Sequence, residues 1–241
     1  MLVNKYFDYL KDIFKALEGE AGHIDQAAAL LADVIEKGGK FYVFGSGHSH
    51  MVAEEIYIRA GGLALVKPIL PGELMLHQMP NKSTYLERLE GYATAMLKLH
   101  KLEGNDAILL ISNSGRNVVP VEMAQEAKAM GAKVIVITSL KHSMSGTSRH
   151  KSGKKMYEFA DVIIDNQAPP GDAGFFVEGV EAPVGPVSDF TGIAIADALV
   201  AALVEKLHQK GLETPIFKSS NMDGADEYNN ALFDKYYGYD K

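Results

Sequence analysis

The sequence predicts an α/β fold, a doubly wound parallel five-stranded sheet in the order 2-1-3-4-5 with helices on both faces. Three observations lead to this prediction. Short apolar runs alternate with stretches of helical spacing, which is typical of βαβ units. Two of these runs, ILLIS and VIVITS, are apolar almost throughout, as strands buried on both faces require. Several runs end in loops rich in Gly and Ser, at the edge where parallel sheets place ligands.

The first 37 residues are predicted to form two helices that precede the sheet. Their apolar residues recur at helical spacing in two stripes, with a break at Gly19–Gly22 and a stop at Gly38 and Gly39. We expect residues 1–37 to pack on the domain or on a partner subunit. The stripes consist of Phe7, Leu10, Phe14 and Leu17, followed by Ile24, Ala28, Leu31 and Val34.

The central domain, residues 38–210, is predicted to hold the sheet, and 211–241 to form an aromatic tail that packs on a surface. A Ser-, Lys- and His-rich loop is expected over 139–153, and a Gly- and Pro-rich loop from the last strand to Pro186. The strands are expected at Phe41–Phe44, Ala64–Leu70, Ala107–Ser112, Lys133–Thr138 and Val162–Asp165. The helices are expected at His50–Ala60, Thr84–His100, Val118–Met130 and Asp189–His208.

Composition excludes several classes of function. The 241-residue chain has 24 Lys and Arg against 31 Asp and Glu, for a net charge of −7, so a broad basic face for nucleic acid is not expected. The absence of cysteine excludes disulfides, thiolate catalysis and Cys-ligated zinc. No apolar run reaches the ~18 residues of a membrane span, and no signal segment opens the sequence. We therefore expect a cytoplasmic protein that binds neither nucleic acid nor membrane.

Two loops carry the functional signal, Gly45–Ser49 after one apolar run and Ser112–Asn117 after another. In a 2-1-3-4-5 sheet the strands before these loops are neighbours at the switch point, so the loops should face one crevice. Each loop also opens a predicted helix, whose first N–H groups favour an anion. The bland alternative is that these residues only turn the chain and cap helices.

The residue types in the two loops suit a phosphorylated, hydroxyl-rich ligand. Their glycines allow close approach of the backbone, and their serine hydroxyls can bond phosphate or sugar oxygens. The GSG sequence is not GxGxxG and no P-loop lysine follows, so dinucleotide and NTP binding are weak alternatives. The glycines are Gly45, Gly47 and Gly115, and the serines are Ser46, Ser49, Ser112 and Ser114.

These motifs resemble the sugar isomerase (SIS) domain family. The first loop is similar to its G-x-G-x-S pattern and the second to its S-x-S-G pattern, and ISNSGRNVVPVEMAQEAKAMGAKVIVITS resembles the second half of SIS domains. The stretch Gly61–His77 is similar to arabinose-5-phosphate isomerases. The segment TPIFKSSNMDGADEYNN resembles a branch of bacterial SIS proteins labelled as phosphosugar isomerases. The resemblance covers roughly residues 25–210.

The resemblance implies a set of phosphosugar-binding residues. His48 stands where arabinose-phosphate isomerases have a Lys, and Arg116 replaces a common Glu; Arg116 either contacts the phosphate or faces solvent. Ser188 matches a Ser or Thr of a phosphosugar loop. The predicted binding residues are Gly45, Ser46, Gly47, His48, Ser49, Ser112, Asn113, Ser114, Gly115, Arg116, Asn117 and Ser188.

Isomerisation of an aldose to a ketose needs a base that moves a proton between C1 and C2 and an acid for the carbonyl oxygen. Glu55, on the helix after the first loop, and His77, in the loop after Pro71, are the predicted catalytic residues. The competing interpretations are a solvated helix residue and a surface histidine. Glu54 and Glu73 are further candidates, whereas Glu122 is expected at the surface.

A metal is the remaining question, because His50 and Glu54 are four residues apart and share a helix face that His77 could join. Phosphoheptose isomerases use a His and a Glu four apart on this helix with zinc, but their pair aligns about five residues later. We therefore predict no metal and no cofactor. His142 and His150, in the basic loop, are expected to be solvated.

The resulting hypothesis is a phosphosugar isomerase that works through an enediol. The alternatives are a non-catalytic phosphosugar sensor, and an SIS lyase acting on an amino-sugar phosphate. The expected partners are a sugar phosphate and, because SIS sites are usually completed by a neighbouring subunit, further copies of the chain in a dimer or tetramer.

Overall fold

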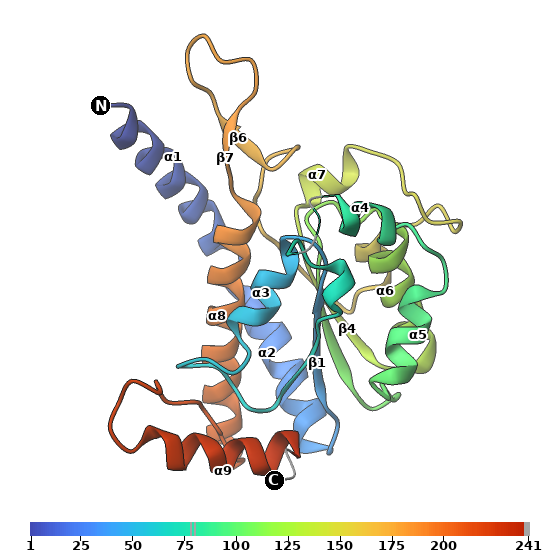
Figure 1. The fold of residues 1–241 in the computed structure, drawn as a ribbon, viewed down its shortest axis with the longest axis vertical. Helices are drawn as coiled ribbons and strands as arrows, with labels where there is room; N and C mark the ends of the chain where they lie inside the picture. Colours follow the sequence, from blue (N-terminus) through green and yellow to red (C-terminus); the bar gives the residue numbers. More distant parts are fainter. Residues whose placement is uncertain (78, 80, 239–241) are drawn as a thin grey trace.

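The computed structural model describes residues 1–77, 79 and 81–238, and its centre is a parallel sheet of five strands in the predicted order β2-β1-β3-β4-β5 (Figure 1). β1 and β3 are buried throughout, as their apolar sequences require, whereas the outer strands β2 and β5 each contain half-buried residues. Their bounds are β1 Phe41–Gly45, β2 Val66–Ile69, β3 Ala107–Ile111, β4 Lys133–Thr138 and β5 Val162–Asp165.

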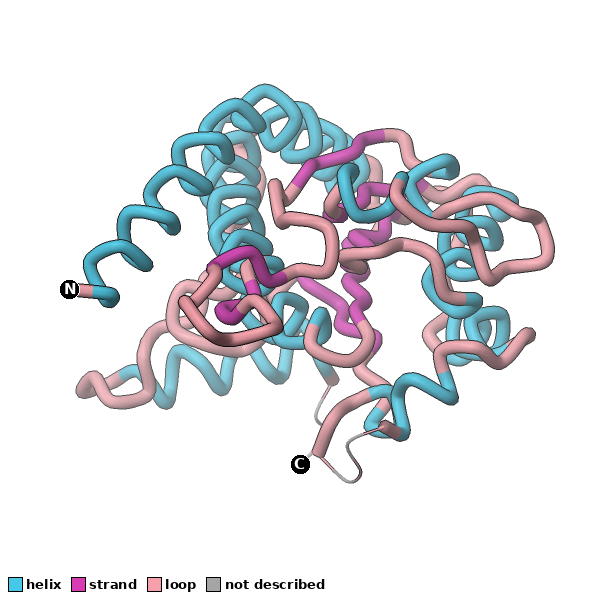
Figure 2. Tube along the Cα trace, turned by 90° about the horizontal axis from the view of Figure 1, so that it is seen from above, coloured by secondary structure: helices cyan, strands magenta, loops and turns pink. Residues whose placement is uncertain are grey.

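Helices cover both faces of the sheet, which Figure 2 shows from above. On one face α2, α3 and α8 pack against side chains such as Val43 and Leu109. On the other, α5 and α6 pack against alternate side chains such as Phe44 and Leu110. The helices of the two layers are α2 Ala21–Glu36, α3 Ser49–Glu55 and α8 Ser188–Gln209, then α4 Lys82–Leu86, α5 Tyr92–Leu99 and α6 Val118–Met130.

Several predicted elements are shorter or more divided than expected. The helix expected at Thr84–His100 is split into α4 and α5, because Gly91 adopts a left-handed conformation before α5. The helix after the first loop ends at Glu55, and Ile58 has a positive φ of 36°. Short 3-10 turns lie at Glu18–Glu20, Gly72–Leu74 and Met156–Phe159.

Both segments expected to be loops contain regular structure. The loop expected over 139–153 begins with the short helix α7 Leu140–Met144, whose N-terminus is capped by the Ser139 hydroxyl accepting from His142 N–H. The loop before Pro186 contains the antiparallel hairpin of β6 Ala173–Phe175 and β7 Val184–Pro186. The hydrophobic pattern did not predict these short elements, because a helix started by a polar cap and a hairpin of three-residue strands give little periodic signal.

The two ends of the chain behave differently. Helix α1 Leu2–Leu17 projects from the body beside the β6–β7 hairpin and buries only Leu17 (Figure 1). Helix α9 Ala225–Tyr237 packs against the sheet edge, where the Tyr237 hydroxyl donates to Val66 O at 3.0 Å and the Lys67 amine donates to Tyr236 O. The described part of the aromatic tail thus contacts the β2 strand of its own chain.

Candidate functional site

The parallel register brings the two loops to one edge of the sheet. Gly45, the last residue of β1, pairs with Ile111, the last residue of β3, so both strands end at the same level. The segments Gly45–Ser49 and Ser112–Asn117 therefore leave the sheet side by side. We call this region, with the two loops as its centre, the paired-loop edge. The predicted adjacency at the switch point is confirmed.

The first loop is held in a tight turn that depends on glycine. A Cβ built on Gly45 would lie 2.2 Å from the Ser49 carbonyl oxygen, and Gly47 has a φ of +57°. The Gly47 N–H donates to Leu74 O at 2.8 Å, which fastens the loop to the 3-10 turn Gly72–Leu74. Ser46 is buried, whereas Ser49 is half-buried at the start of α3.

Ionisable side chains gather around the first loop. His50 is 2% exposed; its Nδ1 contacts Gly47 O, and its Nε2 is buried with no hydrogen-bond partner, 3.6 Å from Glu54 Oε1. The His77 ring meets the His50 ring edge to face at 5.5 Å. Asp189, in the first turn of α8, is close enough for His48 and His50 to lower its pKa, although desolvation raises that pKa overall. The structure thus brings His77 to the first loop.

Glu73, another predicted acid–base candidate, forms a hydrogen bond within the protein. Its carboxylate accepts from the Tyr92 hydroxyl at 2.8 Å. Its own backbone N–H and the Tyr92 hydroxyl lower the pKa of Glu73. This bond ties the segment that carries His77 to α5.

The second loop is supported from below by polar groups of neighbouring strands. The Gly115 N–H donates to Ser112 Oγ at 3.2 Å, and the Thr138 hydroxyl donates to Ser112 O at 2.7 Å. Asn166 Nδ2 donates to Asn113 Oδ1 at 3.2 Å. These bonds hold the loop in place, and Ser114 is half-buried among them with no hydrogen bond of its side chain recorded in the described chain. Ser114 is thus available to a ligand.

Asn117, at the end of the second loop, is the centre of a polar network. Its Nδ2 donates to Glu87 Oε2, and its Oδ1 accepts from Arg149 Nη1 at 2.6 Å. The Glu87 carboxylate also faces the first loop, since a Cβ built on Gly47 would lie 3.8 Å from Glu87 Oε1. Glu87 therefore spans both loops, a role that its sequence position between two helices did not suggest.

The segment after α7 lays basic side chains beside the second loop. Lys155 is buried, donates to Ser143 O, and has its pKa lowered by desolvation and by Arg116. Desolvation also lowers the pKa of His142, where Asp172 opposes Lys155 and Arg116. The surroundings of the second loop are thus positively charged in a protein that is acidic overall.

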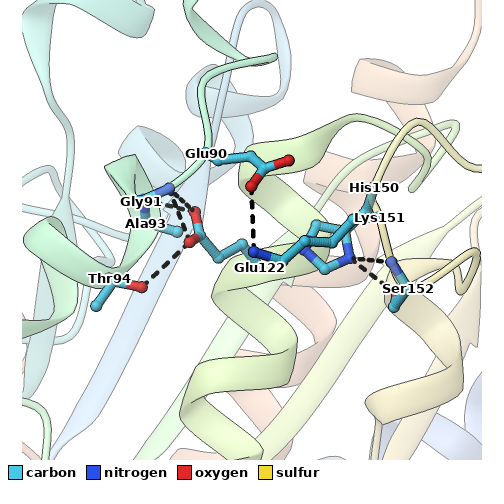
Figure 3. A network of polar contacts seen from close by, with 8 residues as sticks. All are labelled: Glu90, Gly91, Ala93, Thr94, Glu122, His150, Lys151 and Ser152. Atoms are coloured by element: carbon cyan, nitrogen blue, oxygen red, sulfur yellow. Dashed lines mark hydrogen bonds and ion pairs between the residues drawn. The ribbon is translucent and has the colours of Figure 1, made fainter.

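Three expectations about individual side chains are corrected by the structure, and Figure 3 shows the contacts of Glu122 and His150. Glu122 is buried rather than at the surface, because its carboxylate accepts from Gly91 N–H at 2.9 Å and Ala93 N–H at 3.2 Å and so caps α5. His150 is buried rather than solvated, with Nδ1 2.8 Å from Ser152 Oγ. His142 is half-buried. The Lys151–Glu90 ion pair at 3.1 Å fastens the basic segment to the turn before α5.

Ser188 lies at the start of α8 and is engaged within the protein. Its hydroxyl donates to Asp172 Oδ2 at 2.9 Å, and its N–H donates to Asp172 Oδ1 at 2.8 Å. Asp172 has a φ of 74°, and with these bonds it caps the helix. A ligand hydroxyl or phosphate would have to share or replace this partner to use Ser188.

Glu55 lies apart from His77. Its carboxylate pairs with Arg59 of the following turn, and together they line a pocket of about 490 Å³ between α3 and α8. Asp197 of α8 shares the pocket; desolvation and the Glu55 charge raise its pKa, which Arg59 lowers. The structure therefore places the two predicted catalytic residues in different surroundings.

The described residues offer neither a ready metal site nor a membrane span. No group of three or more His, Asp or Glu side chains there is arranged to hold a metal ion, so His50, Glu54 and His77 do not form a ready site. Within the same residues, no helix has both the length and the apolar character to cross a bilayer.

Sequence reasoning missed the residues that reach the loops from elsewhere. Glu87, Arg149 and Asp189 lie far from the loop motifs in sequence and belong to no recurring pattern, whereas Asp172 could be noted only as one of several acidic residues in the long loop before Ser188. Asp189 had one usable signal, because a carboxylate in the first turn of a long helix beside the sheet edge is poised to interact with neighbouring histidines.

Comparisons with known proteins agree with this geometry. A family model described as SIS domain matches residues 5–139, which include both loops. A UPF0309 protein of Halalkalibacterium halodurans is 55% identical over 239 residues, which are 98% of this chain and 99% of that protein. A UPF0309 protein of Geobacillus thermodenitrificans is 40% identical, with coverages of 98% and 95%.

Solved structures show the same fold. A phosphoheptose isomerase from Neisseria gonorrhoeae matches with a TM-score of 0.56 at 17% identity, covering 84% of this chain and 97% of its own. A phosphoheptose isomerase from Francisella tularensis matches with a TM-score of 0.52 at 18% identity, covering 84% and 96%. At such identities the likeness concerns the arrangement of the sheet and its helices.

Proposed function

Because the chain belongs to the SIS domain family, we propose that it binds a sugar phosphate at the paired-loop edge and interconverts its aldose and ketose forms in the cytoplasm. The observation that supports this proposal most is the pairing of Gly45 with Ile111, which sets two hydroxyl-bearing loops side by side. One phosphorylated sugar can then engage both loops.

The second loop is the better candidate for the phosphate. Ser112 and Ser114 supply hydroxyls, the loop opens α6, and Lys155 precedes Met156, whose N–H donates to Gly115 O. Backbone N–H groups and the positive end of a helix favour an anion, and nearby cations increase that preference. Binding through this group would orient the sugar and provide remote binding energy for the reaction.

The first loop is the better candidate for proton transfer. His77 would exchange a proton with the reacting carbons or their oxygens, and the His50 ring against it would fix its orientation. Glu55 remains the proposed second acid–base group, although the structure places it in the α3–α8 pocket with Arg59 and Asp197 and not beside His77. Replacing Glu55 with Gln tests that part separately.

We also propose that the protein is a homodimer or tetramer assembled through α1. The helix leaves Phe7 55% and Phe14 45% exposed, and a pocket of about 760 Å³ lined by both extends to Phe190 of α8. Exposed apolar side chains gathered in this way are typical of an interface. Light scattering after size-exclusion chromatography should show an oligomer, and Phe14→Asp should dissociate it.

The proposed activity is tested with a panel of aldose, ketose and N-acetylhexosamine phosphates, followed by NMR and calorimetry. Interconversion of one aldose–ketose pair, with binding that disappears when the phosphate is removed, is the expected result. Binding without turnover would instead indicate a sensor, and release of a substituent from an amino sugar would indicate a lyase. No phosphate-dependent binding across the panel would refute the proposal.

A further inference from the structure

Three of the four arginines in the whole sequence gather next to the second loop. They come from separate segments: Arg88 follows α4, Arg116 is in the loop, and Arg149 follows α7. The Arg149 N–H donates to Arg116 O at 2.8 Å, and Arg149 Nη1 reaches Asn117. We call Arg88, Arg116 and Arg149 the arginine cluster. The fourth, Arg59, pairs with Glu55 on α3.

The cluster has more positive charge than its protein partners neutralise. Within the part of the chain that the structure describes, none of its guanidinium groups forms an ion pair, and Arg116 Nε is buried without a hydrogen-bond partner. Desolvation, then Arg116 and Arg88, lower the pKa of Arg149, and Glu87 alone opposes them. Like charges held together in this way are relieved by a bound anion.

The cluster lies beside the proposed phosphate position rather than on it. Glu87 stands between them: its carbonyl accepts from Val119 N–H at 2.9 Å in the first turn of α6, and its carboxylate accepts from Asn117. Arg116, Arg88 and Glu87 all lie close enough to Arg149 to affect its pKa, whereas Ser112 directly follows β3 and precedes the arginine of the loop by four residues. One phosphate at the serines would leave the exposed Arg88 and Arg149 guanidinium groups without an anionic ligand.

We propose that the arginine cluster is a second anion subsite and that the ligand is a sugar phosphate carrying a further anionic group, either a carboxylate or a second phosphate. This inference rests on the proposed function, because it assumes that the first phosphate binds at the serines. Guanidinium groups present forked N–H donors that match carboxylate and phosphate oxygens, so three of them form a selective site for such a group.

The test uses inorganic phosphate as the probe and the Nε–H signals of the arginines as the readout. With only four arginines, a ¹H–¹⁵N spectrum resolves each one, and Arg59 is an internal reference. Titration should shift the Arg88, Arg116 and Arg149 signals and, as a separate event, the Gly115 amide. Arg149→Gln and Arg88→Gln should each weaken the phosphate binding that shifts the arginine signals about tenfold, roughly 1.4 kcal/mol. Both should leave unchanged the binding that shifts the Gly115 amide, which we call the Gly115 event.

Matched variants separate this inference from the proposed function. Ser114→Ala should weaken only the Gly115 event, and Lys98→Gln, which removes an exposed positive charge on α5, should change neither. A single event that both Arg149→Gln and Ser114→Ala weaken would mean one shared anion and would overturn the second subsite. Arginine signals that do not move with phosphate would overturn it as well. Loss of the Gly115 event alone would count against the proposed function and not against the cluster.

Discussion

The two loops at the paired-loop edge are similar in sequence and different in surroundings. Around Gly45–Ser49 the neighbours are imidazole rings and carboxyl groups, with His77 against His50 and Asp189 nearby. Around Ser112–Asn117 they are guanidinium and ammonium groups together with the Glu87 carboxylate. Serine and glycine allow a ligand to bind close to the backbone of each loop, and side chains from distant segments set the charge around each loop. We infer a proton-transfer end and an anion-binding end.

The largest expected effect separates the two ends by kinetics. His77→Gln removes the proposed proton carrier from the first loop, and should lower kcat about 10²- to 10⁴-fold while the Kd of the sugar phosphate changes less than about threefold. His23→Gln, at an exposed histidine on α2, is the control. An equal loss in kcat and in affinity would remove the distinction between the two ends.

The next effect concerns the backbone of the loops. Gly45→Ala forces a Cβ to 2.2 Å from Ser49 O and should reduce the free energy of unfolding by about 3 kcal/mol, as overpacking does. Gly115→Ala meets the movable Ser143 hydroxyl at 3.3 Å and a φ of +54°, and should cost about 1 kcal/mol. Urea denaturation compares them, with Gly22→Ala as the control because nothing lies within 4 Å there. Equal losses would contradict the tighter first loop.

A smaller effect is expected in affinity at the second loop. Ser114→Ala should weaken sugar phosphate binding about tenfold, because one hydrogen bond to a charged oxygen is lost, and should leave kcat within about threefold. Calorimetry measures the first and NMR turnover the second. Ser220→Ala, in the exposed part of the tail, is the matched control. A loss of kcat with unchanged affinity would place the chemistry at the second loop instead.

The smallest effect tests the anchor behind His77. Tyr92→Phe breaks the bond to Glu73 and should reduce the free energy of unfolding by about 1 kcal/mol, or the Tm by about 2–4 °C. The folded protein lowers the pKa of Glu73, so this contribution is complete above the ordinary Glu value of about 4.3 and is lost as pH falls through the lowered value. It should be constant between about pH 5 and 9.

Melting curves of wild type and variant across that range check this prediction. Tyr85→Phe is the control, because that ring is 69% exposed. A difference that grows on acidification would contradict the assignment of the bond to an ionised Glu73.

The fold was predictable because its signals are periodic. Runs such as ILLIS predict strands buried on both faces, and the helical stripe that includes Leu31 predicts a helix that packs on those strands. The same logic failed where a single residue decides the backbone. Gly91 divides one expected helix, and the Ser139 cap starts α7, and neither changes the hydrophobic pattern.

The site was predictable only as far as local motifs reach. The loops themselves, and His77 beside the first of them, could be found from their sequences. Arg149 and Glu87 could not, because they act across the fold and no spacing links them to Asn117. Glu55 shows a second limit. It ends the helix that begins at the first loop, but the sequence did not reveal that its side chain would meet Arg59 and Asp197.

The docking of α9 has a consequence for the behaviour of the protein in concentrated solution. β2 is the outer strand of an open sheet, and such a strand can recruit strands of other molecules. The Tyr237 hydroxyl donates a hydrogen bond to the Val66 carbonyl, and the Lys67 amine donates one to Tyr236 O near the end of α9. We infer that the last helix shields this edge from self-templated polymerisation, and a version shortened before α9 should fold and then form β-rich aggregates over time.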